Sequence, residues 1–187
     1  MGALTLFILP GWQNSGPGHW QSRWEALHGA VRVQQHDWQR PKSGDWQIQL
    51  EEAVLAADPA RPIGLLAHSL GCQLVARWAS HSRHAARVQA VLLVAPPDTE
   101  TPANRHILPG WAPIPQQRLP FASLVIASHD DPFCSFARAQ WMSQCWGSGL
   151  HDAGNRGHLN ADSGLGDWPE GWRLWNALLG RSSPSCF

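Results

Sequence analysis

Four short and nearly uninterrupted apolar segments recur along the chain, separated by segments whose apolar residues follow a helical period. The apolar segments are residues 3–9, 62–68, 88–95 and 122–128, with weaker strand candidates at 31–35 and 149–154. The expected helices span residues 19–29, 45–58, 69–82, 135–147 and 167–180. Strands that are apolar throughout are typical of parallel sheets covered by helices on both faces. The alternation therefore predicts an α/β fold: a three-layer α/β/α arrangement around a mostly parallel, doubly wound sheet.

The helical period also predicts which side chains face the sheet. The inward face of segment 19–29 is expected to carry Trp20, Trp24 and Leu27. The inward face of segment 45–58 is expected to carry Ile48, Leu50, Val54 and Leu55.

The length of 187 residues fits a single domain over residues 1–187, with residues 181–187 expected as a frayed tail. The proline-rich stretch 95–120 is the one long irregular segment, and loops of that length in compact domains usually have a function. Only 26 residues separate the strand ending at 95 from the strand beginning at 122. That is too few for a helical cap domain, so we expect an uncapped sheet edge.

The charge balance argues against two classes of partner. The chain has 14 basic and 14 acidic residues, so no net field favours nucleic acid or an anionic membrane. Segment 3–9 resembles a strand rather than a signal peptide, and no apolar run reaches the ~18 residues of a membrane span. We therefore expect a soluble cytoplasmic protein.

The cysteines and histidines give little support for a metal site. Cys72, Cys134, Cys145 and Cys186 are scattered without a C-x-x-C pair, so neither a zinc site nor a disulfide framework is expected. A metal site formed by His129, Asp130, Asp131 and His158 remains an alternative, although these residues lack close ligand spacing. We predict no metal and no cofactor. The other histidines near these motifs, such as His68 and His151, are expected to be structural.

The segment AHSLGC (67–72) places Ser69 between a predicted strand and a predicted helix. It is one residue away from the G-x-S-x-G nucleophile elbow, because Ala67 stands where the first glycine belongs and Gly71 supplies the second. A serine at such a turn exposes its hydroxyl beside the positive end of the helix dipole. The alternative is that Ser69 only caps the helix.

An activated serine needs a base, and the base needs an acid that orients it. In a doubly wound sheet these groups follow later strands, in the order serine, acid, histidine. Asp130 and Asp131 follow the predicted strand 122–128, and His158 lies in a glycine-bracketed loop after the weak strand near 149–154. We choose Asp131 as the acid, because a residue before proline is held extended, and expect Asp130 to cap the turn.

The loop after the first strand should complete the site. Gly11 would allow close approach of the backbone, so the N–H groups of Trp12 and Leu70 are the expected oxyanion donors. Gln13, Trp111 and Phe133 are candidate substrate-binding residues on loops. An aromatic side chain on a loop is as often part of the packing as of a binding site.

Taken together, four blocks resemble one family: LPGW (9–12) with Trp20, AHSLGC (67–72), SHDDPFCS (128–135) and GNRGHLN (154–160). This is the small α/β-hydrolase family that includes retinoblastoma-binding protein 9 and bacterial serine hydrolases. The resemblance covers essentially the whole chain, with the blocks in the family's order. It implies a minimal hydrolase fold, with Ser69 as nucleophile, Asp131 as orienting acid and His158 as base. The departure is Ala67, where the wider pattern has glycine.

These observations predict a serine hydrolase that cleaves small acyl esters through an acyl-enzyme. A protein-interaction module on the same fold, with an unidentified protein partner and little turnover, is the alternative from another class, because fold does not fix function. Amide or peptide cleavage ranks below ester cleavage, because nothing in the chain resembles a peptide-specificity pocket.

Overall fold

The protein is built around a six-stranded sheet in the order β2-β1-β3-β4-β5-β6, and every neighbouring pair is parallel. The computed structural model describes residues 4–182. The strands are β1 (Thr5–Leu9), β2 (Val31–Arg32), β3 (Ile63–His68), β4 (Val88–Val94), β5 (Ala122–Ala127) and β6 (Gly149–Asp152). The two weaker strand candidates, 31–35 and 149–154, correspond to β2 and β6, the short strands at the two edges of the sheet.

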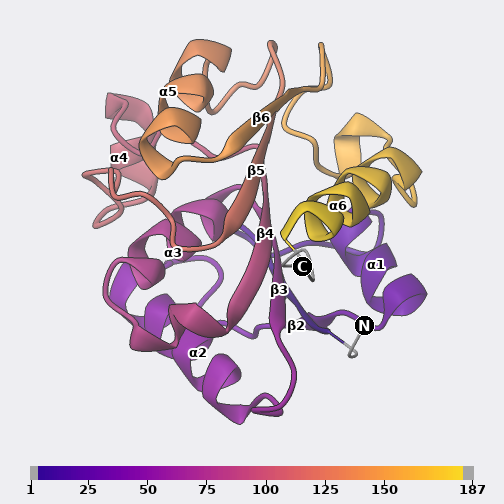
Figure 1. Ribbon diagram of the computed structural model, residues 1–187. Helices are drawn as coiled ribbons and strands as arrows, with labels where there is room; N and C mark the ends of the chain where they lie inside the picture. The colour runs from indigo at the N-terminus through magenta and orange to yellow at the C-terminus, as the bar shows by residue number, and fades with distance from the viewer. Residues whose placement is uncertain (1–3, 183–187) are drawn as a thin grey trace.

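Helices cover both faces of the sheet, which is seen nearly edge-on in Figure 1. Helices α1 (Trp20–His28) and α6 (Pro169–Ser182) lie on one face, and α2 (Ser43–Ala56), α3 (Leu70–Ala79) and α5 (Phe136–Trp146) lie on the other. The predicted three-layer α/β/α fold is confirmed. None of the helices within residues 4–182 is long and apolar enough to cross a bilayer.

The long segment between β4 and β5 contains one short helix, α4 (Pro102–Ile107), so it is not irregular throughout. Thr101 caps this helix by accepting a hydrogen bond from the Asn104 N–H, and Pro102 occupies the first turn. Within the described residues no cap domain lies over the sheet. Helix α6 continues to Ser182, two residues into the segment expected to fray, and residues 183–187 lie outside the described part.

Three predicted inward positions are instead exposed. Leu27, Ile48 and Leu55 have 54%, 57% and 56% of their surface accessible. The buried side chains of the two helices follow a narrower i, i+4 stripe, with Trp20 and Trp24 in α1 and Trp46, Leu50 and Val54 in α2. These large residues fill the space above the sheet, and the neighbouring positions are turned toward solvent.

The two helical layers have separate cores that differ in composition. The layer of α1 and α6 is rich in tryptophan, because Trp20, Trp24, Trp168 and Trp175 pack with Ile8 and Leu66 against the sheet. The opposite layer is larger and mainly aliphatic along β3, β4 and α3. Both contain the fully buried strand residues that gave the sequence its apolar runs.

The chain leaves the adjacent strands β1 and β3 toward opposite faces of the sheet. After β1 the chain runs to α1 on one face, and after β3 it runs to α3 on the opposite face (Figure 1). Ligands of open α/β sheets bind at such a switch point, outside the carboxyl ends of the strands. The loop 10–19 and Ser69 flank this position.

Candidate active site

Ser69 occupies the sharp turn between β3 and α3. Its backbone adopts φ 53° and ψ −123°, which lies in a region that non-glycine residues rarely enter. Its N–H donates to the Val94 carbonyl at 2.9 Å, and its own carbonyl accepts from the Cys72 N–H at 2.9 Å. The side chain makes no capping bond to the helix, in contrast to the alternative in which Ser69 is only an N-cap.

Two glycines allow this turn to lie against the end of β1. A Cβ at Gly71 would overlap the carbonyl oxygen of Leu9, and a Cβ at Gly11 would lie 2.6 Å from the Cβ of Ser69. Ala67, the departure from the usual pattern, is fully buried and pairs with Leu9 in the sheet. Glycine is therefore required at positions 71 and 11, whereas position 67 has room for the methyl group of alanine.

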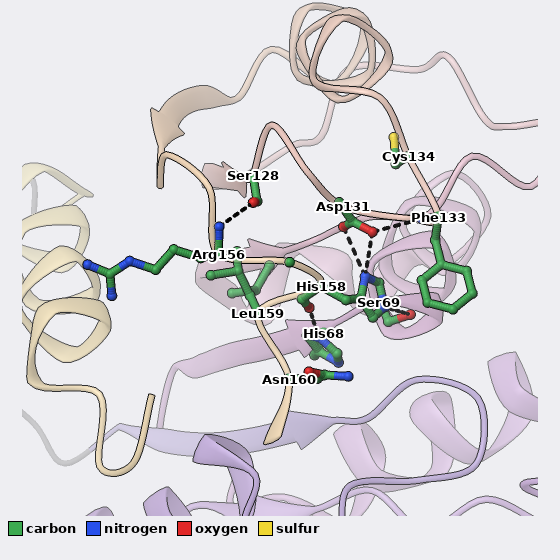
Figure 2. Close-up of polar contacts among 12 residues, drawn as sticks. His68, Ser69, Ser128, Asp131, Phe133, Cys134, Arg156, His158, Leu159 and Asn160 are labelled. Carbon is green, nitrogen blue, oxygen red and sulfur yellow. Dashed lines mark hydrogen bonds and ion pairs between the residues drawn. The ribbon is translucent and has the colours of Figure 1, made fainter. Parts of the chain in front are cut away.

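Ser69, His158 and Asp131 form a continuous hydrogen-bond chain (Figure 2). The Nε2 atom of His158 lies 2.9 Å from Ser69 Oγ, and its Nδ1 atom lies 2.9 and 3.0 Å from the two Asp131 oxygens. The side chains of His158 and Asp131 are only 10% and 3% exposed. The Phe133 N–H also donates to Asp131 Oδ1 at 2.9 Å, which fixes the carboxylate. This geometry can move a proton from the serine hydroxyl to the imidazole.

The neighbouring Asp130 is turned away from the imidazole. Its Oδ1 atom accepts from the Ser128 hydroxyl at 2.6 Å and from the Gly157 N–H at 2.7 Å. These hydrogen bonds hold the pKa of the Asp130 carboxyl below its ordinary value. The two adjacent aspartates therefore have separate contacts, and Asp130 holds the loop of His158 as well as its own turn.

The loop after β1 lies beside the serine. A Cβ on Gly11 would be 3.0 Å from Ser69 Oγ and 3.1 Å from the Leu70 nitrogen, so the backbone of the loop passes close to both. Leu70 is the first residue of α3, and an N–H in this position has no acceptor within its own helix. Trp12, whose indole N–H donates to the Gln39 carbonyl at 2.9 Å, follows in the same loop.

A cavity of about 280 Å³ opens above Ser69. Of the predicted substrate-binding residues, Gln13 and Phe133 line it. The ring centroids of Phe133 and His158 are 4.6 Å apart. The prediction missed the contributions from α4 and its flanks. That segment adds Pro97, Asn104, Ile107 and Leu108 to the lining, and His19 and His68 are among the lining residues from elsewhere. The proline-rich composition of the segment indicated a functional loop but not which of its residues face the cavity.

The prediction that Trp111 binds substrate is wrong for this structure. The side chain is fully buried, its N–H donates to the Pro41 carbonyl at 2.9 Å, and its ring contacts that of Trp46 at 5.5 Å. Arg77 also donates to the Trp111 carbonyl. An indole whose apolar surface and N–H are both satisfied inside the protein belongs to the core.

Two further imidazoles lie beside the cavity. His68 Nε2 lies 2.9 Å from the carbonyl oxygen of His158, and the His19 ring contacts the His68 ring at 4.6 Å. Burial, with His158 and Arg32 nearby, lowers the pKa of His19 to about 3. Burial, with His19 and His158 nearby, lowers the pKa of His68 well below its ordinary value. Both rings are therefore neutral at physiological pH.

The alternative metal site finds no support in the geometry. Among residues 4–182 no group of three or more histidine, cysteine and acidic side chains could hold a metal ion. His129 instead pairs with Asp152 at 2.8 Å.

The thiol of Cys134 lies close to Asp131. Burial and the nearby Asp131 raise the pKa of this thiol to about 12, so it stays protonated.

Solved structures similar to this one include several described as hydrolases or esterases. A YdeN-like hydrolase from Pectobacterium atrosepticum superimposes with a TM-score of 0.83 at 28% identity, over 97% of this chain and 93% of that chain. The ydeN gene product from B. subtilis gives 0.79 at 20% identity, over 95% and 100% of the two chains. Esterase 2 from Thermogutta terrifontis shares the fold, with a TM-score of 0.67 at 16% identity over 95% and 83%. No curated protein sequence matches significantly.

The sequence itself matches the model of the serine hydrolase family over residues 6–177. The chain belongs to this family of serine hydrolases.

Proposed function

We propose that the protein hydrolyses small carboxylic esters, with Ser69 as nucleophile, His158 as general base and acid, and Asp131 as the residue that orients the imidazole. The observation that carries this proposal is the hydrogen-bond chain from Asp131 through His158 to Ser69, with every heavy-atom distance between 2.9 and 3.0 Å. Asp131 accepts from Nδ1–H, which leaves the lone pair of Nε2 directed at the serine hydroxyl.

In the first half of the reaction, Ser69 Oγ attacks the ester carbonyl carbon while its proton moves to His158 Nε2. The carbonyl oxygen becomes negatively charged, and the N–H groups of Leu70 and Trp12 stabilise it. His158 then gives its proton to the alkoxide oxygen of the leaving alcohol as the C–O bond breaks. In the second half, water attacks the acyl-enzyme, its proton passes to His158, and the acid leaves as Ser69 recovers its proton.

The size of the cavity favours small substrates. Its volume of about 280 Å³ lies at the lower end of the range for small-molecule sites. Phe133, Ile107 and Leu108 give it an apolar wall, as a short acyl chain requires. We therefore expect acetyl and butyryl esters to react faster than long-chain esters, and the proposed chemistry calls for no cofactor.

The test is labelling with a fluorophosphonate probe together with turnover of p-nitrophenyl acetate, butyrate and octanoate. We expect S69A to abolish labelling and to lower kcat by about 10⁴-fold or more. The control S80A changes an exposed serine at the end of α3 and should retain both activities. Absence of Ser69-dependent labelling in the folded wild type would overturn the proposal and favour the protein-interaction alternative. Faster turnover of octanoate would contradict the expected preference for small substrates.

A further inference from the structure

The loop that carries His158, residues 154–160, has an unusual backbone. Gly154, Gly157 and Leu159 have φ values of 71°, 57° and 50°. No strand or helix within the loop holds His158 in place, because β6 ends at Asp152 and the next 3₁₀ turn begins at Ala161. The position of the imidazole therefore depends on contacts from other parts of the molecule.

Two of these contacts reach carbonyl groups of His158 and the next residue. His68 Nε2 lies 2.9 Å from the His158 carbonyl oxygen, and the indole N–H of Trp20 donates to the Leu159 carbonyl at 3.0 Å. A carbonyl oxygen only accepts, so the hydrogen of His68 must be on Nε2. His68 directly precedes Ser69, and its ring lies below the His158 loop in Figure 2.

His19 fixes the orientation of this ring. Its Nδ1 atom accepts from the Gln21 N–H at 3.1 Å, so its own hydrogen is on Nε2. That Nε2 atom is buried without a hydrogen-bond partner, and the His19 ring meets the His68 ring at 4.6 Å with an angle of 69° between the planes. This edge-to-face contact limits rotation of His68.

We propose that His68 is a positioning residue for the reaction: by donating to the His158 carbonyl, it ties the backbone of the general base to the residue beside the nucleophile. The inference rests on the function proposed above. The backbone of Ser69 continues directly into His68, so the hydrogen bond closes a short path between the two reacting side chains. This path keeps His158 Nε2 at its 2.9 Å distance from Ser69 Oγ during the repeated proton transfers.

The test compares H68M with H68Q. Glutamine and methionine have similar length, but only glutamine carries an N–H donor at the end of the side chain. We expect H68M to lower kcat for p-nitrophenyl butyrate by about 10²-fold while KM changes little, because a loss of position affects the transition state more than binding. H68Q should recover most of this loss, and fluorophosphonate labelling rates should follow kcat.

The control is H84Q, which changes a histidine of the 3₁₀ turn Arg83–Arg87 that contacts Glu51 of α2 and does not line the cavity. It should alter the melting temperature more than kcat. If H68M fails to unfold cooperatively, H68A, which removes the donor without adding a new group, replaces it. Equal activity of H68M and H68Q, whether high or low, would overturn the inference while S69A still tests the proposed function. A folded wild type without Ser69-dependent turnover would overturn both.

Discussion

The sharp turn at Ser69 and the loop of His158 meet at the same hydrogen bond but are stabilised in different ways. The turn is held by its immediate surroundings: Gly71 lies on the Leu9 carbonyl, and the Ser69 N–H donates to Val94 of the adjacent strand. The His158 loop depends on residues from other loops and helices. Its partners include Ser128 and Asp130 after β5, His68 before Ser69 and Trp20 in α1.

The sequence therefore encodes the two regions differently, the turn through steric requirements and the loop through hydrogen bonds from other segments. The turn is specified mainly by steric contact with the end of β1 and the loop after it, which allows only glycine at positions 71 and 11. The loop depends largely on residues more than 25 positions away, such as Asp130, His68 and Trp20, beside a local hydrogen bond from Ser163 to the Arg156 carbonyl. Changes to the turn should therefore affect the fold, and changes to the contacts of the loop should mainly affect the reaction.

The largest effect is expected at Asp131, the carboxylate proposed to orient His158. D131N keeps the size of the side chain but replaces an acceptor of the His158 Nδ1–H by an amide, which favours the wrong tautomer. We expect kcat to fall by about 10⁴-fold with little change in thermal stability, measured by ester hydrolysis and by thermal unfolding.

The matched control is D130N, in which the amide oxygen can still accept from Ser128 and Gly157. It should lower kcat by less than about tenfold, as expected for a contact that is weakened but kept. Similar losses in both variants would show that the two aspartates do not have the separate roles assigned to them.

A pair of glycine substitutions compares the two regions directly. In G71A the new methyl group must displace the backbone of β1, so we expect a loss of about 3 kcal/mol or more in the free energy of unfolding. In G157A the nearest atom is 3.7 Å away, and only the positive φ of 57° is unfavourable, at a cost of about 1 kcal/mol. Urea unfolding measures both values.

The control for this pair is G44A in α2, where a Cβ has open space and a helical residue gains stability over glycine. An equal cost at positions 71 and 157 would contradict the distinction between a sterically fixed turn and a tethered loop.

The smallest effect is a dependence of stability on acid. The Ser128 and Gly157 hydrogen bonds lower the pKa of Asp130, so its carboxylate stabilises the folded state above the unfolded pKa of about 3.9. This contribution is lost as the pH falls through the lower, folded-state pKa. Wild type should therefore melt above D130N at pH 7, and the difference should shrink below pH ~4. A constant difference across this range would show that ionised Asp130 does not contribute.

The sheet was predictable because its central strands are buried on both faces and so appear as apolar runs. The turn at Ser69 was predictable because its requirements are local. The chain order of serine, acid and histidine then led to residues that the structure brings within hydrogen-bond distance. In the sequence, only the following proline distinguishes Asp131 from Asp130, because Gly157, which donates to Asp130, lies in another loop.

What the sequence could not provide depends on contacts between distant segments. Trp111 stands in a proline-rich loop, yet Pro41 and Trp46 enclose it from a different part of the chain. Leu27, Ile48 and Leu55 follow a helical period, but the larger tryptophans and the inner aliphatic residues of α1 and α2 already fill the sheet face. His19 and His68 carry no motif that marks them, since their importance lies in their contacts with one another and with the His158 loop.

The tryptophans of the α1–α6 layer also place a group of indole rings beside the loop that carries His158. The chain has 12 tryptophans and no tyrosine, so its near-ultraviolet emission comes from indole rings. The ring centroid of Trp20 lies 4.6 Å from that of Trp24 and 5.1 Å from that of Trp168. The indole N–H of Trp20 donates a hydrogen bond to the Leu159 carbonyl in the loop of His158. We expect a movement of that loop to change the environment of the Trp20 ring, which fluorescence and near-ultraviolet circular dichroism would register without an added label.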